Sequence, residues 1–366
     1  MPVYHDNDSK RATWRCVYRV RGADGRVRQT QKRGFKTKRD AMMYERLQLM
    51  SSQNDTEITF KQFFEDCYSV SKRSECKPTT WATFENRVNM HILPVFGNMR
   101  MADITPLHIL NWTNSLRRQK QEGKYSNEYL RSIYSSLRAI FNFAEAYGPY
   151  ENPMKKTHNF RKEKAKEKTV WTPEQYHKFA SVIRSEGDVL SGVLFDILYY
   201  GGLRISEALA LTADDVDTVN NTVRINKSYQ VINNEKLILT PKTVSSDRVV
   251  PIPSSLASDL SNYIARLPYL HGDERIFSVS RSFVYGRLKK YTALAELPKI
   301  QIHSFRRSYI TLLLHMKYFP IEVSKMVGHS NPTMVYQYSY PYLSVEKELA
   351  QELDKVRLGQ RVFEFK

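Results

Sequence analysis

Six side chains in the C-terminal half of the chain have the types needed for phosphoryl transfer. Arginine guanidiniums bind phosphoryl oxygens in pairs of hydrogen bonds and stay charged at all ordinary pH values. Histidine moves protons near neutral pH, and a tyrosine phenol becomes a nucleophile once a neighbouring group takes its proton. The set comprises Arg204, Lys242, His303, Arg306, His329 and Tyr338. These types suit the attack of a tyrosine oxygen on a phosphate whose charge is held by fixed cations.

The spacing of these residues is more specific than any of them alone. His303 and Arg306 are three apart, so they share one face of a helix, although an isolated pair of this kind is usually a solvated helix face. Tyr338 follows His329 by nine residues and is one of 23 tyrosines. The segments, in chain order, are GGLRISEALAL, TPKTVSSDRVVPIP, IHSFRRS and MVGHSNPTMVYQYSY. Their order and spacing together indicate a single site.

In this order the segments resemble the tyrosine recombinase family, and its phage-integrase branch in particular. The family pattern is an arginine in a GLR-x-SE segment, a lysine in a β-hairpin, an H-x-x-R segment, a GH segment and then the nucleophilic tyrosine. The chain matches each step at the residues named above. The resemblance implies an enzyme that cleaves and rejoins DNA through a 3′-phosphotyrosine. A second DNA 5′-hydroxyl reseals that bond, so no ATP is needed.

The physical roles of the basic residues agree with this reaction. Arg204 and Arg306, with His329 as a third donor, suit the non-bridging phosphate oxygens. Tyr338 is neutral at rest because a free phenol has a pKa near 10, so His303 is the expected proton acceptor. The sequence shows no cluster of acids spaced to hold two metal ions, which predicts a reaction without metal or cofactor.

The role of Lys242 and one further residue, Glu207, complete the predicted site. Lys242, at a hairpin-like turn, is the expected general acid for the departing 5′-oxygen. Glu207 lies one helical turn after Arg204 and is expected to orient it rather than take part in the chemistry.

The choice of nucleophile and of the second arginine rests on register. Tyrosines alternate at 336, 338, 340 and 342, and the family spacing from the GH histidine favours Tyr338, with Tyr336 and Tyr340 as the alternatives. Arg307 adjoins Arg306, but the H-x-x-R register selects Arg306.

Composition points to a polyanionic partner. Lys and Arg number 56 against 38 Asp and Glu, a net charge of +18, which is typical of a nucleic-acid-binding protein. No apolar run is long enough to cross a bilayer and no signal segment opens the chain, so we expect a cytoplasmic protein with no membrane partner. The three cysteines contain no C-x-x-C pair and predict neither a disulfide framework nor a zinc site.

The predicted fold is multidomain and mainly α-helical with small β-sheets. Residues 1–56 form an N-terminal β-hairpin and helix module, from alternation in 13–20 and 26–32 and a helix that starts after Thr37. This module resembles the arm-binding domain of integrases that contact a second set of DNA sites. A strand pair fits a major groove. The residues expected to meet DNA there are Arg15, Arg19, Arg26, Arg28 and Lys32.

Three segments follow. Residues 57–152 predict a helical, SAM-like core-binding domain, in which the aromatic residues are expected to be core rather than base-stacking platforms. Residues 153–169 are polar and basic and predict an exposed linker. Residues 170–366 predict an α+β catalytic domain with a C-terminal tail, with short strands in TVRINKSY, KLILT and RVVPIP and helices again from about Arg281.

The tail is ambiguous in sequence. Residues 344–356 form an amphipathic helical pattern that suits either packing within its own domain or docking on a neighbouring protomer, as the family's tails do. The final RVFEF is strand-like and fits either arrangement.

The resemblance also implies partners and competing functions. The expected partners are double-stranded DNA with core-type and arm-type sites, a homotetramer across two duplexes, a host DNA-bending protein and a directionality factor. The expected function is integration of a phage or mobile element. Alternatives are a chromosome-dimer resolvase of the same family, a type IB topoisomerase, and a DNA-binding regulator that has lost catalysis.

Overall fold

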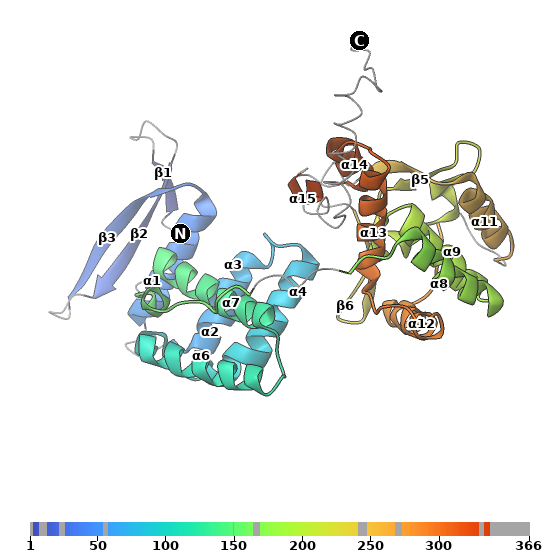
Figure 1. The fold of residues 1–366 in the computed structure, drawn as a ribbon. Helices are drawn as coiled ribbons and strands as arrows, with labels where there is room; N and C mark the ends of the chain where they lie inside the picture. Colours follow the sequence, from blue (N-terminus) through green and yellow to red (C-terminus); the bar gives the residue numbers. More distant parts are fainter. Residues whose placement is uncertain are drawn as a thin grey trace, which may run out of the picture. The chain divides into compact units, whose positions relative to one another are not determined.

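The chain forms two compact units, Met1–Ala165 and Lys166–Lys366 (Figure 1). The computed structural model describes residues 3–6, 13–21, 26–53, 58–148, 150–163, 169–240, 247–267, 273–328 and 333–336. Both units combine helices with small antiparallel sheets, as predicted. Within the described residues, none of the helices is long and apolar enough to pass through a membrane.

The N-terminal part of the first unit is a three-stranded antiparallel sheet with one helix against it. The strands are β1 (Val3–Asp6), β2 (Thr13–Arg21) and β3 (Val27–Phe35), in the order β1-β2-β3. Helix α1 (Lys38–Gln53) begins where the Thr37 hydroxyl accepts a hydrogen bond from the Asp40 amide at 3.1 Å. Cys16, Phe35 and Tyr44 are buried between sheet and helix. The two predicted strands and the predicted helix start are confirmed.

The rest of the first unit is helical around an aromatic core. Its longer helices are α4 (Pro78–Arg87), α6 (Pro106–Gln121) and α7 (Asn127–Tyr147), and shorter turns are α2 (Phe60–Phe63), η1 (Phe64–Ser69), α3 (Val70–Lys72), η2 (Val88–Ile92), α5 (Leu93–Phe96), η3 (Met101–Asp103) and η4 (Pro153–Lys156). Trp81, Phe141 and Phe143 are buried, and Phe84 packs against them. The prediction that these aromatics are core is therefore confirmed.

The predicted exposed linker is wrong for its first eleven residues, 153–163. Met154 and Phe160 are buried in the helical core. Arg131 donates to the carbonyl of Phe160, and the hydroxyl of Tyr134 lies 2.7 Å from that of Thr157. Two apolar side chains in a basic stretch were enough to anchor this segment, because each buried one adds roughly 2 kcal/mol. The boundary between the two units falls directly after it, at residue 165.

The second unit is built around helices α9 (Val189–Tyr200) and α13 (Ile302–His315), which share a core with α8 (Pro173–Ser185). Helix α9 is apolar on nearly all sides and is buried accordingly. The other helices are α10 (Ile205–Ala208), α11 (Ser254–Ala265), α12 (Arg281–Leu294), α14 (Pro320–Val327) and α15 (Thr333–Tyr336), with η5 (Ala213–Asp215) between α10 and the sheets. Helix α11 was not predicted from the sequence, whereas α12 begins at Arg281 as predicted.

Two small sheets accompany these helices. The first has the order β4-β5-β8 and comprises β4 (Val216–Asp217), β5 (Thr222–Ile225) and β8 (Arg248–Pro251). The second is a hairpin of β6 (Ser228–Ile232) and β7 (Glu235–Leu239), which turns at Asn233 and Asn234, both with positive φ. Strand β8 pairs with β5 rather than with the hairpin, so the predicted run 222–229 is two strands in different sheets.

One glycine sets the approach of α13 to the end of α9. Gly202 has φ +62°, and a Cβ added there would lie 2.3 Å from the Tyr309 ring of α13. Only glycine accepts both the left-handed conformation and this contact. The Gly pair in the sequence is therefore a packing requirement that brings the start of α10 beside α13.

We expect Gly202→Ala to destabilise the second unit by about 3 kcal/mol, from left-handed strain plus overpacking. The matched control is Gly187→Ala, because Gly187 has φ +68° but no atom near its missing Cβ. The control isolates the backbone strain, which costs about 1 kcal/mol. Urea unfolding of both variants measures the difference, and equal destabilisation would contradict the role given to Tyr309.

Candidate active site

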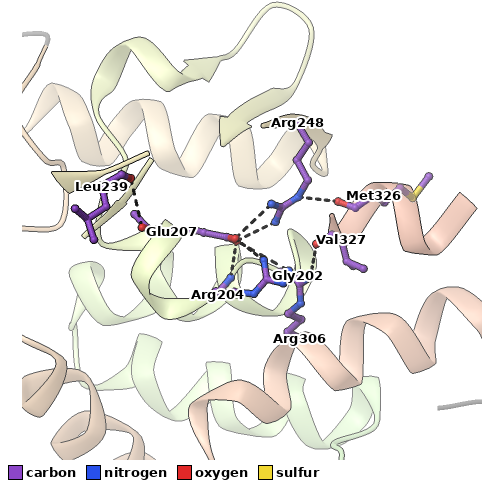
Figure 2. A network of polar contacts seen from close by, with 9 residues as sticks. Gly202, Arg204, Glu207, Leu239, Arg248, Arg306, Met326 and Val327 are labelled. Atoms are coloured by element: carbon purple, nitrogen blue, oxygen red, sulfur yellow. Dashed lines mark hydrogen bonds and ion pairs between the residues drawn. The ribbon is translucent and has the colours of Figure 1, made fainter. Parts of the chain in front are cut away.

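A carboxylate at the start of α10 is surrounded by three arginines that come from distant parts of the chain (Figure 2). Arg204 immediately precedes α10, and the Glu207 carboxylate accepts its backbone amide at 2.9 Å and its Nη1 at 2.7 Å. Both hydrogen bonds run from Arg204 to the carboxylate, so Glu207 satisfies the free backbone amide at the start of a helix of only four residues. These two direct contacts agree with the expectation that Glu207 orients Arg204.

The second arginine, Arg248, was not among the predicted site residues. It is the first residue of β8, and its Nη2 and Nη1 lie 2.9 and 3.4 Å from the two Glu207 oxygens. The alternation of buried and exposed residues along β8 places Arg248 on the same inward face as Val250. The sequence alone does not identify this face, because Val249, which is exposed, and Val250, which is buried, are both apolar.

The third arginine, Arg306, lies on α13 with its side chain only 1% exposed. Its Nη1 donates to the carbonyl of Gly202 at 2.9 Å and lies 4.0 Å from Glu207. Its Nη2 donates to the carbonyl of Val327 at the end of α14. The same side chain thus joins the Gly202 turn, Glu207 and the end of α14.

The charges of this cluster are unequal. Burial would raise the pKa of Glu207, but the hydrogen bond and charge of Arg248, with the charges of Arg204 and Arg306, lower it to about 2. Glu207 is therefore ionised at all physiological pH values. One carboxylate faces three guanidiniums, so the cluster keeps a positive charge, and the Arg204 side chain, 35% exposed, is the most accessible part of it. Such a site attracts an anion.

The other predicted residues divide into two groups. His303 is exposed in the first turn of α13, one turn before Arg306 and on the same helix. Lys242, His329 and Tyr338 lie outside the described residues. Their chain neighbours are described: Leu239 ends β7 and Arg248 begins β8 on the two sides of Lys242, and Gly328, with φ +65°, ends α14 next to His329. The structure thus brings Arg204, Arg306 and Glu207 together.

The five predicted DNA-contact residues of the N-terminal sheet do not share one face. Arg28 and Lys32 pair across the strands with Val20 and Cys16, so they lie on the face covered by α1, where Lys32 Nζ is 4.2 Å from the Tyr44 ring centre.

Arg15 and Arg19 alternate to the opposite, open face of the sheet. Arg19 pairs there with the exposed Gln29, and Arg26 precedes β3 and is exposed. Strand alternation and register therefore place Arg28 and Lys32 on one face of the sheet and Arg15 and Arg19 on the other. The place of Gln29 opposite Arg19 depends on the register, which the sequence alone did not reveal.

Comparison with known families covers most of the chain in three consecutive matches. Residues 2–47 match the Arm DNA-binding domain, residues 59–117 the Phage integrase N-terminal SAM-like domain, and residues 169–342 the Phage integrase family.

Individual relatives agree with these matches. The chain is 28% identical over 302 residues to the ICEBs1 integrase of Bacillus subtilis (strain 168), covering 78% of this chain and 80% of the relative. It is 24% identical over 291 residues to the integrase of Mycobacterium phage D29, covering 75% and 73%.

Two solved structures share the fold. The Tn1549 transposon integrase in complex with transposon right end DNA superposes with a TM-score of 0.64 at 20% identity, covering 81% of this chain and 100% of that one. The lambda integrase tetramer bound to a Holliday junction gives 0.59 at 16% identity, covering 92% and 94%.

The depressed pKa of Glu207 predicts how stability depends on pH. A carboxyl whose folded pKa lies below its ordinary value of 4.5 contributes stability above that pH and loses it as pH falls toward 2. We expect Glu207→Gln to lower the free energy of unfolding by on the order of 3 kcal/mol at pH 7. The difference in unfolding free energy between variant and wild type should become smaller as the pH falls from 4.5 to 2. Urea unfolding across this range measures it. Glu274→Gln, at an exposed site, is the control; a gap independent of pH would contradict the assignment.

The three matches follow one another along the chain in the order that the predicted segments require, and the fold agrees with them. The chain belongs to the phage integrase family of tyrosine recombinases, the enzymes of site-specific DNA recombination.

Proposed function

We propose that the protein integrates a phage or mobile element by cleaving and rejoining DNA through a 3′-phosphotyrosine on Tyr338. The observation that supports this most directly is the arginine cluster on Glu207. It gathers the GLR segment, the H-x-x-R helix and the end of α14 around one positively charged place.

The proposed reaction assigns each bond and proton. The Tyr338 oxygen attacks the phosphorus and passes its proton to His303, and the bond from phosphorus to the 5′-oxygen breaks. Lys242 donates a proton to that departing oxygen. Attack by a second 5′-hydroxyl on the phosphotyrosine reverses these steps on the new strand, and the number of phosphodiester bonds is conserved.

The charge that develops on the phosphate is assigned to the arginines, with His329 as an additional donor. Arg204 is accessible, so it is the proposed direct contact, while Arg306 contributes its charge from the buried side of the cluster. Each fixed donor of this kind typically contributes on the order of 10²–10³-fold in rate. The residues supply all the charge, so no metal or cofactor enters the proposed steps.

The proposed partners are DNA and further copies of the chain. Core-type DNA would meet the second unit and the helical part of the first, and arm-type DNA would meet the open face of the N-terminal sheet, where Arg15 and Arg19 lie. A tetramer on two duplexes, a host DNA-bending protein and a directionality factor complete the proposed assembly. The C-terminal segment 344–356 lies outside the described residues, so its packing in its own domain or on a neighbouring protomer stays a prediction.

The nucleophile is tested with a nicked suicide substrate, from which the cleaved fragment diffuses away. We expect a covalent protein–DNA adduct that survives SDS, forms in the presence of EDTA, and is absent from Tyr338→Phe. Tyr336→Phe and Tyr340→Phe are the matched controls and should still form it. An adduct with Tyr338→Phe would refute the assignment of the nucleophile. Absence of an adduct from the wild-type protein as well as from all three variants would favour a DNA-binding regulator.

The sheet face is tested by substitutions rather than by deletion, because Met43 of α1 is buried against the helical core and would be lost with residues 1–50. We expect Arg15→Ala and Arg19→Ala to weaken binding to arm-type DNA about tenfold each, while cleavage at the core site persists. Arg28→Ala, on the α1 face, is the control with the same loss of charge. Equal weakening by all three variants, measured by titration at one salt concentration, would contradict the proposed face.

A further inference from the structure

We propose that Arg248 is a positioning residue for DNA cleavage, which holds together the segments that carry Arg204, Lys242 and His329. The inference rests on the proposed function, because those three residues are given their roles there. It adds a residue outside the set that the family pattern names in this chain.

The burial of Arg248 demands an explanation. Its side chain is only 6% exposed, and a buried guanidinium is costly unless its charge and its N–H groups are matched. The charge of Arg248 is matched by a carboxylate, and its N–H groups donate to that carboxylate and to a backbone carbonyl. Nη2 and Nη1 donate to Glu207 at 2.9 and 3.4 Å, and Nε donates to the carbonyl of Met326 at 3.0 Å.

The first link runs through Glu207 to Arg204. The Glu207 oxygens that accept from Arg248 also accept the Nη1 and the backbone amide of Arg204, at 2.7 and 2.9 Å. Arg248 therefore limits the orientations open to the carboxylate, and the carboxylate in turn limits those of Arg204. A planar fork that binds both oxygens holds the carboxylate more tightly than a single contact would.

The second link runs to the end of α14. Met326 lies three residues before His329, and its carbonyl accepts from Arg248 Nε. The next carbonyl, of Val327, accepts from Arg306. Two consecutive carbonyls at one helix end are thus held by two arginines of the same cluster (Figure 2). Gly328 then turns the chain out of the helix.

The third link is covalent. Arg248 begins β8 six residues after Lys242, so its contacts anchor one end of the segment that carries the proposed general acid. Arg248 itself is too deeply buried to meet a phosphate, and its donors already point to Glu207 and Met326. We therefore assign it to positioning and not to contact with DNA.

Lysine cannot replace these contacts. An ammonium keeps the charge but cannot reach two carboxylate oxygens and a carbonyl in one plane. Arg248→Lys therefore separates position from charge. The matched control is Arg224→Lys on the neighbouring strand β5. This arginine is exposed, and its ion pair with Asp247 is long, at 3.9 Å.

The experiment measures single-turnover cleavage of the suicide substrate by the full chain at saturating protein. At saturating protein a partial loss of folded protein leaves the rate constant unchanged, whereas a loss of position lowers the rate constant of the protein that remains folded. We expect Arg248→Lys to slow the rate constant by about 30- to 100-fold, with its dissociation constant for DNA changed by less than about threefold. Arg224→Lys should cleave within about twofold of wild type.

A double variant tests the route through Glu207. If Arg248 acts on Arg204, the two substitutions share one effect and are not additive. In an Arg204→Lys background, Arg248→Lys should therefore slow cleavage by less than about fivefold. Multiplication of the two separate effects would overturn this route, because it would show independent contributions.

The outcomes distinguish the two proposals. Absence of an adduct from wild type would defeat the proposed function itself. A normal adduct from wild type with an unchanged rate constant for Arg248→Lys, whatever its yield, would defeat the positioning role and leave the proposed function standing. A rate constant that falls together with DNA affinity would also defeat it, because Arg248 would then act on binding.

Discussion

The second unit depends on one buried carboxylate that three arginines share. Removing either partner of a buried ion pair typically costs 3–5 kcal/mol, because the charge that remains has lost both water and its counterion. Glu207 and Arg248 cannot separate without leaving such an unpaired charge in the interior. Arg204 and Arg306 lie beside the same carboxylate. The site therefore keeps an excess of positive charge in a defined place before any DNA arrives, which is the condition for electrostatic stabilisation without reorganisation.

The surrounding fold serves that cluster. Gly202 lets α13 approach the end of α9, which places Arg306 within reach of the Gly202 carbonyl. Strand β8 leaves the hairpin and pairs with β5, which turns Arg248 inward. Backbone carbonyls at the end of α14 accept hydrogen bonds from Arg248 and Arg306. Helix α13, strand β8, the Gly202 turn and the end of α14 therefore all contribute groups to the cluster.

The first unit follows a different logic. Its core is rich in aromatic residues, and its N-terminal sheet is small, with α1 covering one face. Arg39 of α1 donates to the carbonyl of Ser71 and to the hydroxyl of Ser74 at 2.9 Å, and Asp40 accepts from the Tyr147 hydroxyl at 3.1 Å. The sheet module is therefore joined to the helical part by its helix, and the opposite face of the sheet carries Arg15 and Arg19.

The sequence by itself determined the family and the mainly helical fold, and the family pattern grouped Arg204, Glu207 and Arg306, because caps, periodicity and motif order can be read along the chain. Tertiary structure decided what depends on register and burial. Arg248 became part of the site only when β8 turned its arginine inward, and the five basic residues of the N-terminal sheet separated onto two faces. Residues 153–163 joined the helical core instead of forming a linker. Each of these outcomes follows from which partner a residue meets across space, and no single chain segment encodes that partner.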